Sequence, residues 1–153
     1  MASLLVLAAG CEGFTPEAVD SGEAADARGE IQSLYQRLGG YDALAAINDA
    51  LGARIFDDPK FEQILARMAE ESGDRVRQLS ILHFCEVTGG DCVYIGRDLK
   101  TLHTGMGITD EHWQSFMGHL GDAMTELNVA DAEQSEVIDI FSSFQDQIVD
   151  GKP

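Results

Sequence analysis

The sequence predicts an all-α domain over residues 29–150, and three observations carry this prediction. From Gly29 onward the apolar residues recur at spacings of three and four, the period of a helix with one buried face. No segment alternates apolar and polar residues as a half-buried strand does. With 153 residues, 44% of them hydrophobic and 24% charged, the chain has the composition of one globular domain and no room for a second.

The first helices are separated by glycine. One helix is expected around Ile31 to Leu38, and Gly39-Gly40 breaks the chain before the next. The second helix carries one apolar stripe, formed by Leu44, Ile47, Leu51 and Ile55. A shorter third piece, from about Pro59 to Met68, carries Phe61, Ile64 and Leu65.

The fourth helix is longer and ends at Thr88-Gly89-Gly90, where glycine can take the left-handed conformation that stops a helix. Its buried face consists of Val76, Leu79, His83, Phe84 and Val87. The following segment, Asp91 to Gly96, is expected to be a loop.

The second half of the domain contains three more helices. A short one, from about Arg97 to Thr104, is expected to stop at Gly105 and Gly107. Thr109 is suited to cap the next helix, because its hydroxyl can accept a hydrogen bond from a free backbone amide. That helix presents Trp113, Phe116, Met117, Leu120, Met124 and Leu127, and a single last helix presents Val137, Ile140, Phe141, Phe144 and Ile148. The total is about six helices without an internal repeat.

Charge and cysteine content exclude several classes of protein. Asp and Glu number 27 against 10 Lys and Arg, so the net charge is −17 and the chain lacks the basic face that a nucleic-acid binder needs. Cys11, Cys85 and Cys92 are too few and too scattered for a disulfide-built scaffold or a Cys-rich zinc site. Cys85 and Cys92 flank a helix stop and would either pair in an exported domain or remain buried thiols in a cytosolic one.

The N-terminal residues have the pattern of a targeting signal. Residues 1–11 place the short apolar run Leu4 to Ala9 before Gly10 and Cys11, which resembles a bacterial lipoprotein signal whose cysteine is lipidated, although no basic residue precedes the run. Residues 12–28 are expected to form an acidic linker. The protein would then be lipid-anchored or periplasmic; the alternative is a frayed extension of a cytoplasmic protein.

Three local motifs occur in a fixed order. They are Ser33-Leu34-Tyr35-Gln36-Arg37-Leu38-Gly39-Gly40, the turn Thr88-Gly89-Gly90, and Tyr94-Ile95-Gly96-Arg97-Asp98-Leu99-Lys100-Thr101-Leu102-His103 followed by Gly107-Ile108-Thr109. In this order and spacing the chain resembles a truncated haemoglobin of the first group over about residues 33–129. The resemblance implies a two-over-two helical sandwich around haem, within a truncated globin domain at 29–150.

The resemblance places His103 as the proximal ligand of the haem iron. Neutral imidazole is a good iron ligand, and its other ring nitrogen can orient it. His112 and His119 lie seven residues apart with no third ligand at a suitable spacing, which argues against a zinc site. His83 and Ser80 lie on the helix that matches the family's distal pocket, and both are candidates for the ligand side of the haem.

The resemblance also assigns residues to the haem cavity: Leu65, Val76, Ser80, Phe84, Tyr94, Leu99, Ile108, Trp113 and Phe116. For the apolar members, plain core packing is the alternative. Arg97 is a candidate partner for a haem propionate, because a guanidinium can pair with a carboxylate through two hydrogen bonds. A solvated surface arginine is the alternative there.

Three positions depart from the family pattern. Gly52 stands where the family has a tyrosine that donates to the bound gas, Leu65 matches an aromatic residue, and Ser80 matches the distal glutamine. A hydrogen bond to a strongly polar ligand contributes roughly 1.5 to 3 kcal/mol, so its loss would weaken oxygen retention by about tenfold or more.

The expected function is therefore reversible binding of oxygen, carbon monoxide or nitric oxide at haem iron, in the service of oxygen binding or transport. A haem enzyme that acts on nitric oxide or peroxide, with a reductase as partner, is the second hypothesis. A haem-free helical interaction module is the third, and Gly52 and Leu65 are the residues that favour it.

Overall fold

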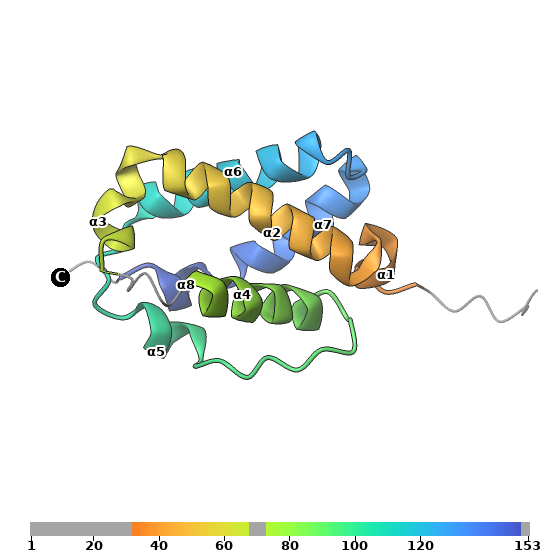
Figure 1. The fold of residues 1–153 in the computed structure, drawn as a ribbon, viewed down its shortest axis with the longest axis horizontal. Coiled ribbons are helices and arrows are strands. Elements are labelled where there is room, and N and C mark those ends of the chain that lie inside the picture. Colours follow the sequence, from red (N-terminus) through yellow and green to blue (C-terminus); the bar gives the residue numbers. More distant parts are fainter. Residues whose placement is uncertain (1–31, 68–72, 151–153) are drawn as a thin grey trace, which may run out of the picture. The chain divides into compact units, whose positions relative to one another are not determined.

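The computed structural model describes residues 32–67 and 73–150. Within these ranges every regular element is a helix, which confirms the all-α prediction (Figure 1). In chain order the elements are α1 (Leu34–Leu38), α2 (Gly40–Asp57), the 3-10 turn η1 (Pro59–Phe61), α3 (Glu62–Leu65), α4 (Gly73–Val87), α5 (Leu99–His103), α6 (Asp110–Glu126), α7 (Asp131–Ser142) and α8 (Gln145–Ile148). The signal-like segment 1–11 and the linker 12–28 lie outside the described residues.

The long helices form two pairs, α2 with α4 and α6 with α7. The pairs are joined where α2 also packs against α6. Figure 1 shows α4 and α5 on the same side of α2, joined by a long loop that runs along the outside of the domain. This is the two-over-two arrangement that the sequence predicts.

Two hydrophobic clusters hold the helices together. The larger contains the fully buried Leu44, Ile47, Leu120, Met124 and Val137, so the faces predicted for α2, α6 and α7 meet in one core. The predicted face of α4 was partly wrong, because α4 contributes Phe84 and Cys85 to this core while Val76 is 41% exposed. Phe61, Ile64 and Ile108 form a smaller cluster beneath α3. Residues of both clusters, Leu51 and Phe84 from the larger and Phe61 and Ile108 from the smaller, line the cavity described below.

Capping residues set the helix boundaries. Ser33 and Gln36 form a capping box that starts α1, and Gly39, at φ 102°, joins α1 to α2 in a left-handed conformation. Thr109 caps α6 as predicted, and its box partner is the His112 side chain. Asp98 caps α5, because its side chain accepts a hydrogen bond from the Thr101 amide. This is why that helix begins at Leu99 and not at Arg97.

The prediction of one last helix was wrong. The chain leaves the α-helix after Ser142 and starts again at Gln145. The hydroxyls of Ser142 and Ser143 donate to the carbonyls of Ile138 and Ile140, at 2.7 and 2.6 Å, and such bonds compete with the helical ladder. The described chain therefore has more helices than the expected six, but Phe144 still lies beside Phe141, at 6.1 Å between ring centroids.

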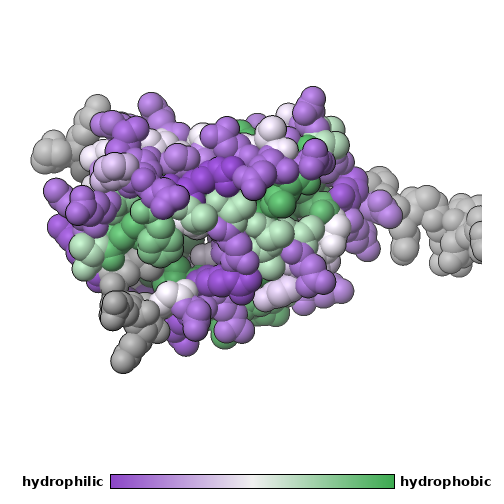
Figure 2. Space-filling model, turned by 45° about the horizontal axis from the view of Figure 1, so that its top comes forward, coloured by the Kyte–Doolittle hydropathy of each residue, from purple (hydrophilic) through white to green (hydrophobic). Residues whose placement is uncertain are grey.

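The surface combines acidic helices with exposed apolar residues. On the face in Figure 2 an apolar band runs between hydrophilic margins. Two strongly exposed apolar residues, Val93 at 68% and Ile95 at 71%, lie on the loop between α4 and α5. Among the described helices, none combines the length and apolarity needed to cross a membrane.

Leu44→Ala tests the core. Leu44 is 0% exposed, so removing its side chain leaves a cavity and should lower the free energy of unfolding by about 2 to 5 kcal/mol. Phe56→Ala is the control, because Phe56 is 68% exposed and should cost far less. Urea unfolding of both variants measures the difference, and equal losses would contradict this core.

Candidate functional site

A cavity of about 710 Å³ opens between the helices, within the size range of small-molecule and cofactor sites. One wall is formed by α2 and α4, and another by the loop 94–97 and α5. Its back consists of aromatic residues from α6 and α7, including Trp113, Phe116 and Phe141. Trp113 stacks on Phe116 at 5.7 Å between ring centroids, which makes this back wall broad and apolar.

His103 ends α5 and lines the cavity. Its Nδ1 lies 2.7 Å from the carbonyl oxygen of Leu99, one turn earlier. A carbonyl can only accept, so Nδ1 carries the hydrogen and Nε2 keeps a free lone pair. The local helix thus fixes the tautomer in which imidazole binds a metal through Nε2.

Carboxylates hold both ends of the segment that carries His103. At the start, Asp98 accepts from the Thr101 amide at 2.9 Å, and this bond lowers the pKa of Asp98. Beyond the end, Asp150 accepts from the amides of Gly105 and Gly107 at 3.1 and 2.7 Å. These amides lower the pKa of Asp150, and its own amide donates to Ile108. The C-terminal segment therefore fixes the chain that follows His103.

His83 is a second histidine on the cavity wall. Its ring lies 5.0 Å from that of Tyr94 and 5.2 Å from that of Phe144. Both ring nitrogens are buried, and neither has a hydrogen-bond partner among the residues that the structure describes. Burial lowers the pKa of His83; the charge of Glu86 opposes this shift, and that of His103 adds to it. His83 is therefore neutral at pH 7, and its unmet nitrogens are the kind of group that a bound molecule satisfies.

The α2 wall is nearly empty of polar side chains. Gly52 lines the cavity, and a Cβ added there would meet no atom within 4 Å. Asn48, one turn earlier on the same face, also lines the cavity. Ser80 faces it from α4.

Most residues that the sequence analysis assigned to a site lie on this one cavity: Val76, Ser80, His83, Phe84, Tyr94, Arg97, Leu99, His103, Ile108, Trp113 and Phe116. Leu65 does not; it packs against the cluster of Phe61 and Ile64, and Phe61 lines the cavity instead. Phe61, the last residue of the turn η1, is therefore the residue of this short segment that lines the cavity.

Sequence reasoning missed several lining residues. Asn48 had a usable signal, because it precedes Gly52 by four residues and so shares its helix face. Phe144 also had a signal, because it follows Phe141 by three residues on the predicted apolar face and both residues line the cavity. His112 lines the cavity as well, but its ring is engaged by Thr109 at 2.8 Å and by the Lys60 carbonyl at 3.0 Å. His119 pairs with Asp58 at 2.9 Å and lies outside the lining.

Comparison with known proteins gives one consistent result. A family model of bacterial-like globins matches residues 33–150. A group 1 truncated hemoglobin of Mycolicibacterium paratuberculosis is 29% identical over 125 residues, which are 82% of this chain and 90% of the relative. Among solved structures, a truncated hemoglobin of Tetrahymena pyriformis in its Fe(III) form superposes with a TM-score of 0.72 at 20% identity, over 78% of this chain and all of that one. Chlamydomonas reinhardtii THB1 does so with a TM-score of 0.64 at 28% identity, over 77% of this chain and 97% of that one.

Asp150→Asn tests the carboxylate that fixes the segment after His103. The folded pKa of Asp150 lies below 3.8, so its contribution to stability is present at neutral pH and is lost as pH falls through that folded pKa. We expect the variant to melt at a lower temperature than the wild type at pH 7, with the difference shrinking in acid.

The control for this prediction is Asp139→Asn, since Asp139 is an exposed carboxylate on α7. Thermal unfolding monitored by circular dichroism between pH 7 and pH 3 would follow all three proteins. A melting difference for Asp150→Asn that stays constant over this range would contradict the assigned role.

Proposed function

The chain belongs to the bacterial-like globin family and is a group 1 truncated haemoglobin with haem as its cofactor, and from this premise we propose that His103 binds the haem iron and that a diatomic gas binds reversibly on the opposite face. The observation that supports His103 most directly is its Nδ1–H bond to the Leu99 carbonyl at 2.7 Å, which leaves Nε2 free in a residue that lines the cavity.

The residues present fit haem. The cavity is broad and mostly apolar, as a porphyrin ring requires, and its aromatic back wall offers flat surfaces for packing. Arg97 lies at the cavity, and within the described residues its guanidinium makes no ion pair or hydrogen bond, so it is available for a propionate carboxylate. When bound, haem supplies the iron at which a gas molecule coordinates.

The chain's own contribution on the gas side is small. Gly52 offers no donor, so the polar side chains that α2 and α4 bring to the cavity are those of Asn48, Arg75, Ser80 and His83. We assign the distal role to Ser80 and His83, because the neutral His83 ring has one N–H for which residues 32–67 and 73–150 provide no acceptor. With so few donors, oxygen should leave faster than from a pocket with a tyrosine at position 52.

His103→Ala tests the iron ligand. Removing the imidazole removes the nitrogen that binds iron, so the variant should lose stable one-to-one haem uptake. Titration of the apoprotein with haem, followed by absorption, measures this. His119→Ala removes a histidine outside the cavity and should keep normal uptake. A wild-type haem spectrum in His103→Ala would refute the proposed ligand.

Gly52→Tyr tests the missing donor. A Cβ at position 52 would meet no atom within 4 Å, and a phenol hydroxyl carried from there should slow oxygen dissociation by about tenfold or more. Gly52→Phe adds the same ring without the hydroxyl and separates hydrogen bonding from bulk. Stopped-flow oxygen dissociation compares the variants, and equal rates in Tyr and Phe variants would mean that position 52 does not reach the gas.

A further inference from the structure

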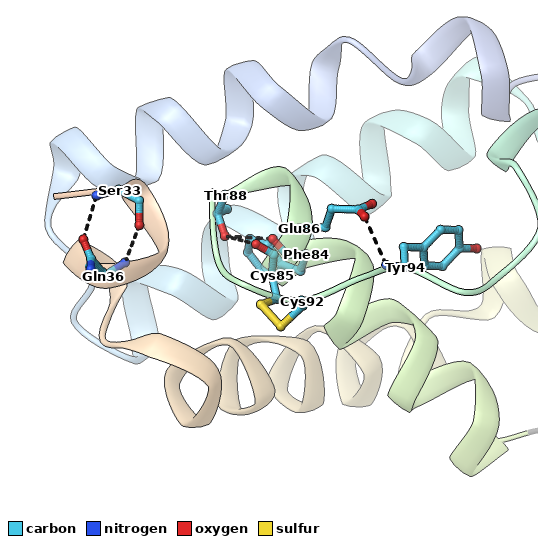
Figure 3. The surroundings of a disulfide bond; sticks show 8 residues. All are labelled: Ser33, Gln36, Phe84, Cys85, Glu86, Thr88, Cys92 and Tyr94. Atoms are coloured by element: carbon cyan, nitrogen blue, oxygen red, sulfur yellow. Dashed lines mark hydrogen bonds between the residues drawn. A yellow bond between two sulfur atoms is a disulfide. The ribbon is translucent and has the colours of Figure 1, made fainter. Parts of the chain in front are cut away.

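A disulfide joins helix α4 to the wall of the cavity. Cys85 lies in the last turns of α4, and Cys92, seven residues later, lies on the loop towards α5 (Figure 3). Their Cα atoms are 5.8 Å apart, which is the usual separation for a disulfide. Gly90 passes so close to this bond that an added Cβ would lie 2.5 Å from the Cys85 sulfur, so glycine is required there.

Apart from the disulfide, few interactions hold the loop of residues 91–97 against the rest of the domain. Within the described residues, the Tyr94 amide is the single backbone group of residues 91–97 that binds outside the loop, donating to the exposed Glu86 carboxylate at 3.1 Å (Figure 3). The Tyr94 hydroxyl donates to the Arg97 carbonyl at 2.8 Å, which is internal to the loop. Val93 and Ile95 are 68% and 71% exposed, so their side chains bury little apolar surface against the domain. The disulfide is thus the loop's strongest attachment to α4.

The loop matters because of what it carries. Tyr94, Ile95, Gly96 and Arg97 line the cavity, and the Tyr94 ring packs against His83. One residue further, Asp98 caps the helix that ends in His103. A change in the loop therefore reaches the cavity wall, the propionate candidate Arg97 and the start of the His103 helix together.

We propose that Cys85–Cys92 is a site of thiol–disulfide exchange with a dithiol reductant, and that its reduction releases the 91–98 loop and shortens haem retention. This inference rests on the proposed haem function. The protein would then have a disulfide state and a dithiol state, which share one fold and differ in how fast they lose haem.

The exchange begins at Cys92, because Cys85 is 0% exposed while Cys92 is only partly buried. A thiolate of the reductant attacks the Cys92 sulfur, the Cys85–Cys92 bond breaks, and the Cys85 sulfur leaves and takes up a proton. The second thiol of the reductant then attacks the mixed disulfide, and the Cys92 thiolate leaves and is protonated. Two electrons pass to the protein, and the dithiol becomes a disulfide.

The test compares haem loss from the full chain in its disulfide and dithiol states. Haem-loaded protein is mixed with an excess of a haem-scavenging apoglobin, before and after treatment with dithiothreitol, and the transfer rate is read from the Soret band. We expect loss to be faster in the reduced protein by on the order of tenfold, the lower end of what a disulfide constraint contributes.

Two variants make the result specific. Cys92→Ala, measured without reductant, should lose haem at the reduced rate, which separates the disulfide from any direct effect of dithiothreitol on iron. Cys11→Ser removes the third cysteine and should behave as the wild type. Hydrogen exchange of amides 91–98 adds a readout independent of haem: exchange should be faster in the reduced protein and in Cys92→Ala, with the α2 core unchanged.

The outcomes are distinguishable. Free thiols at positions 85 and 92 in air-oxidised protein, found by alkylation and mass spectrometry, would overturn the inference. So would equal haem-loss rates in oxidised, reduced and Cys92→Ala proteins that all bind haem. A wild-type protein that takes up no haem would instead overturn the proposed function, and this inference with it.

Discussion

The hydrogen bond from His103 Nδ1 to the Leu99 carbonyl is the interaction on which the site depends. It settles which ring nitrogen can bind a metal, and it does so within one turn of a five-residue helix. A helix this short has little stability of its own, so its position comes from its ends. Asp98 caps its start, and Asp150 binds the two glycine amides beyond it. The proposed iron ligand is therefore positioned by backbone amides and carboxylates, while hydrophobic packing positions the rest of the cavity.

The opposite side of the cavity, formed by α2 and α4, has few hydrogen-bond donors. Gly52 has no side-chain donor and Ser80 has a single hydroxyl, so a gas bound as proposed would meet few hydrogen bonds from these walls. Both ring nitrogens of His83 are buried, and neither has a partner among the described residues. In the proposed function, retention of the gas would depend on the α2 and α4 walls, and retention of the haem on α5 with its adjoining loop.

Much of this could be predicted from sequence because the signals are local. Helical spacing predicted the core residues from Leu44 to Val137, and Thr109 and Gly39 marked helix ends through ordinary capping chemistry. The break after Ser142 could not be predicted, because it arises from serine hydroxyls that bond back to the helix in competition with its ladder. The Cys85–Cys92 pairing needed the loop geometry, since the spacing alone also fits two thiols. Leu65 was expected on the cavity but packs on the cluster of Phe61 and Ile64, and Phe61 lines the cavity instead.

The most direct test of the account is the visible absorption spectrum of the haem-reconstituted protein, reduced and then exposed to carbon monoxide. If His103 binds iron on one face and the other face is open, one haem binds per chain and its Soret band shifts when the gas is added. A protein that takes up no haem, or whose reduced spectrum is unchanged by carbon monoxide, would contradict an open, His103-ligated site.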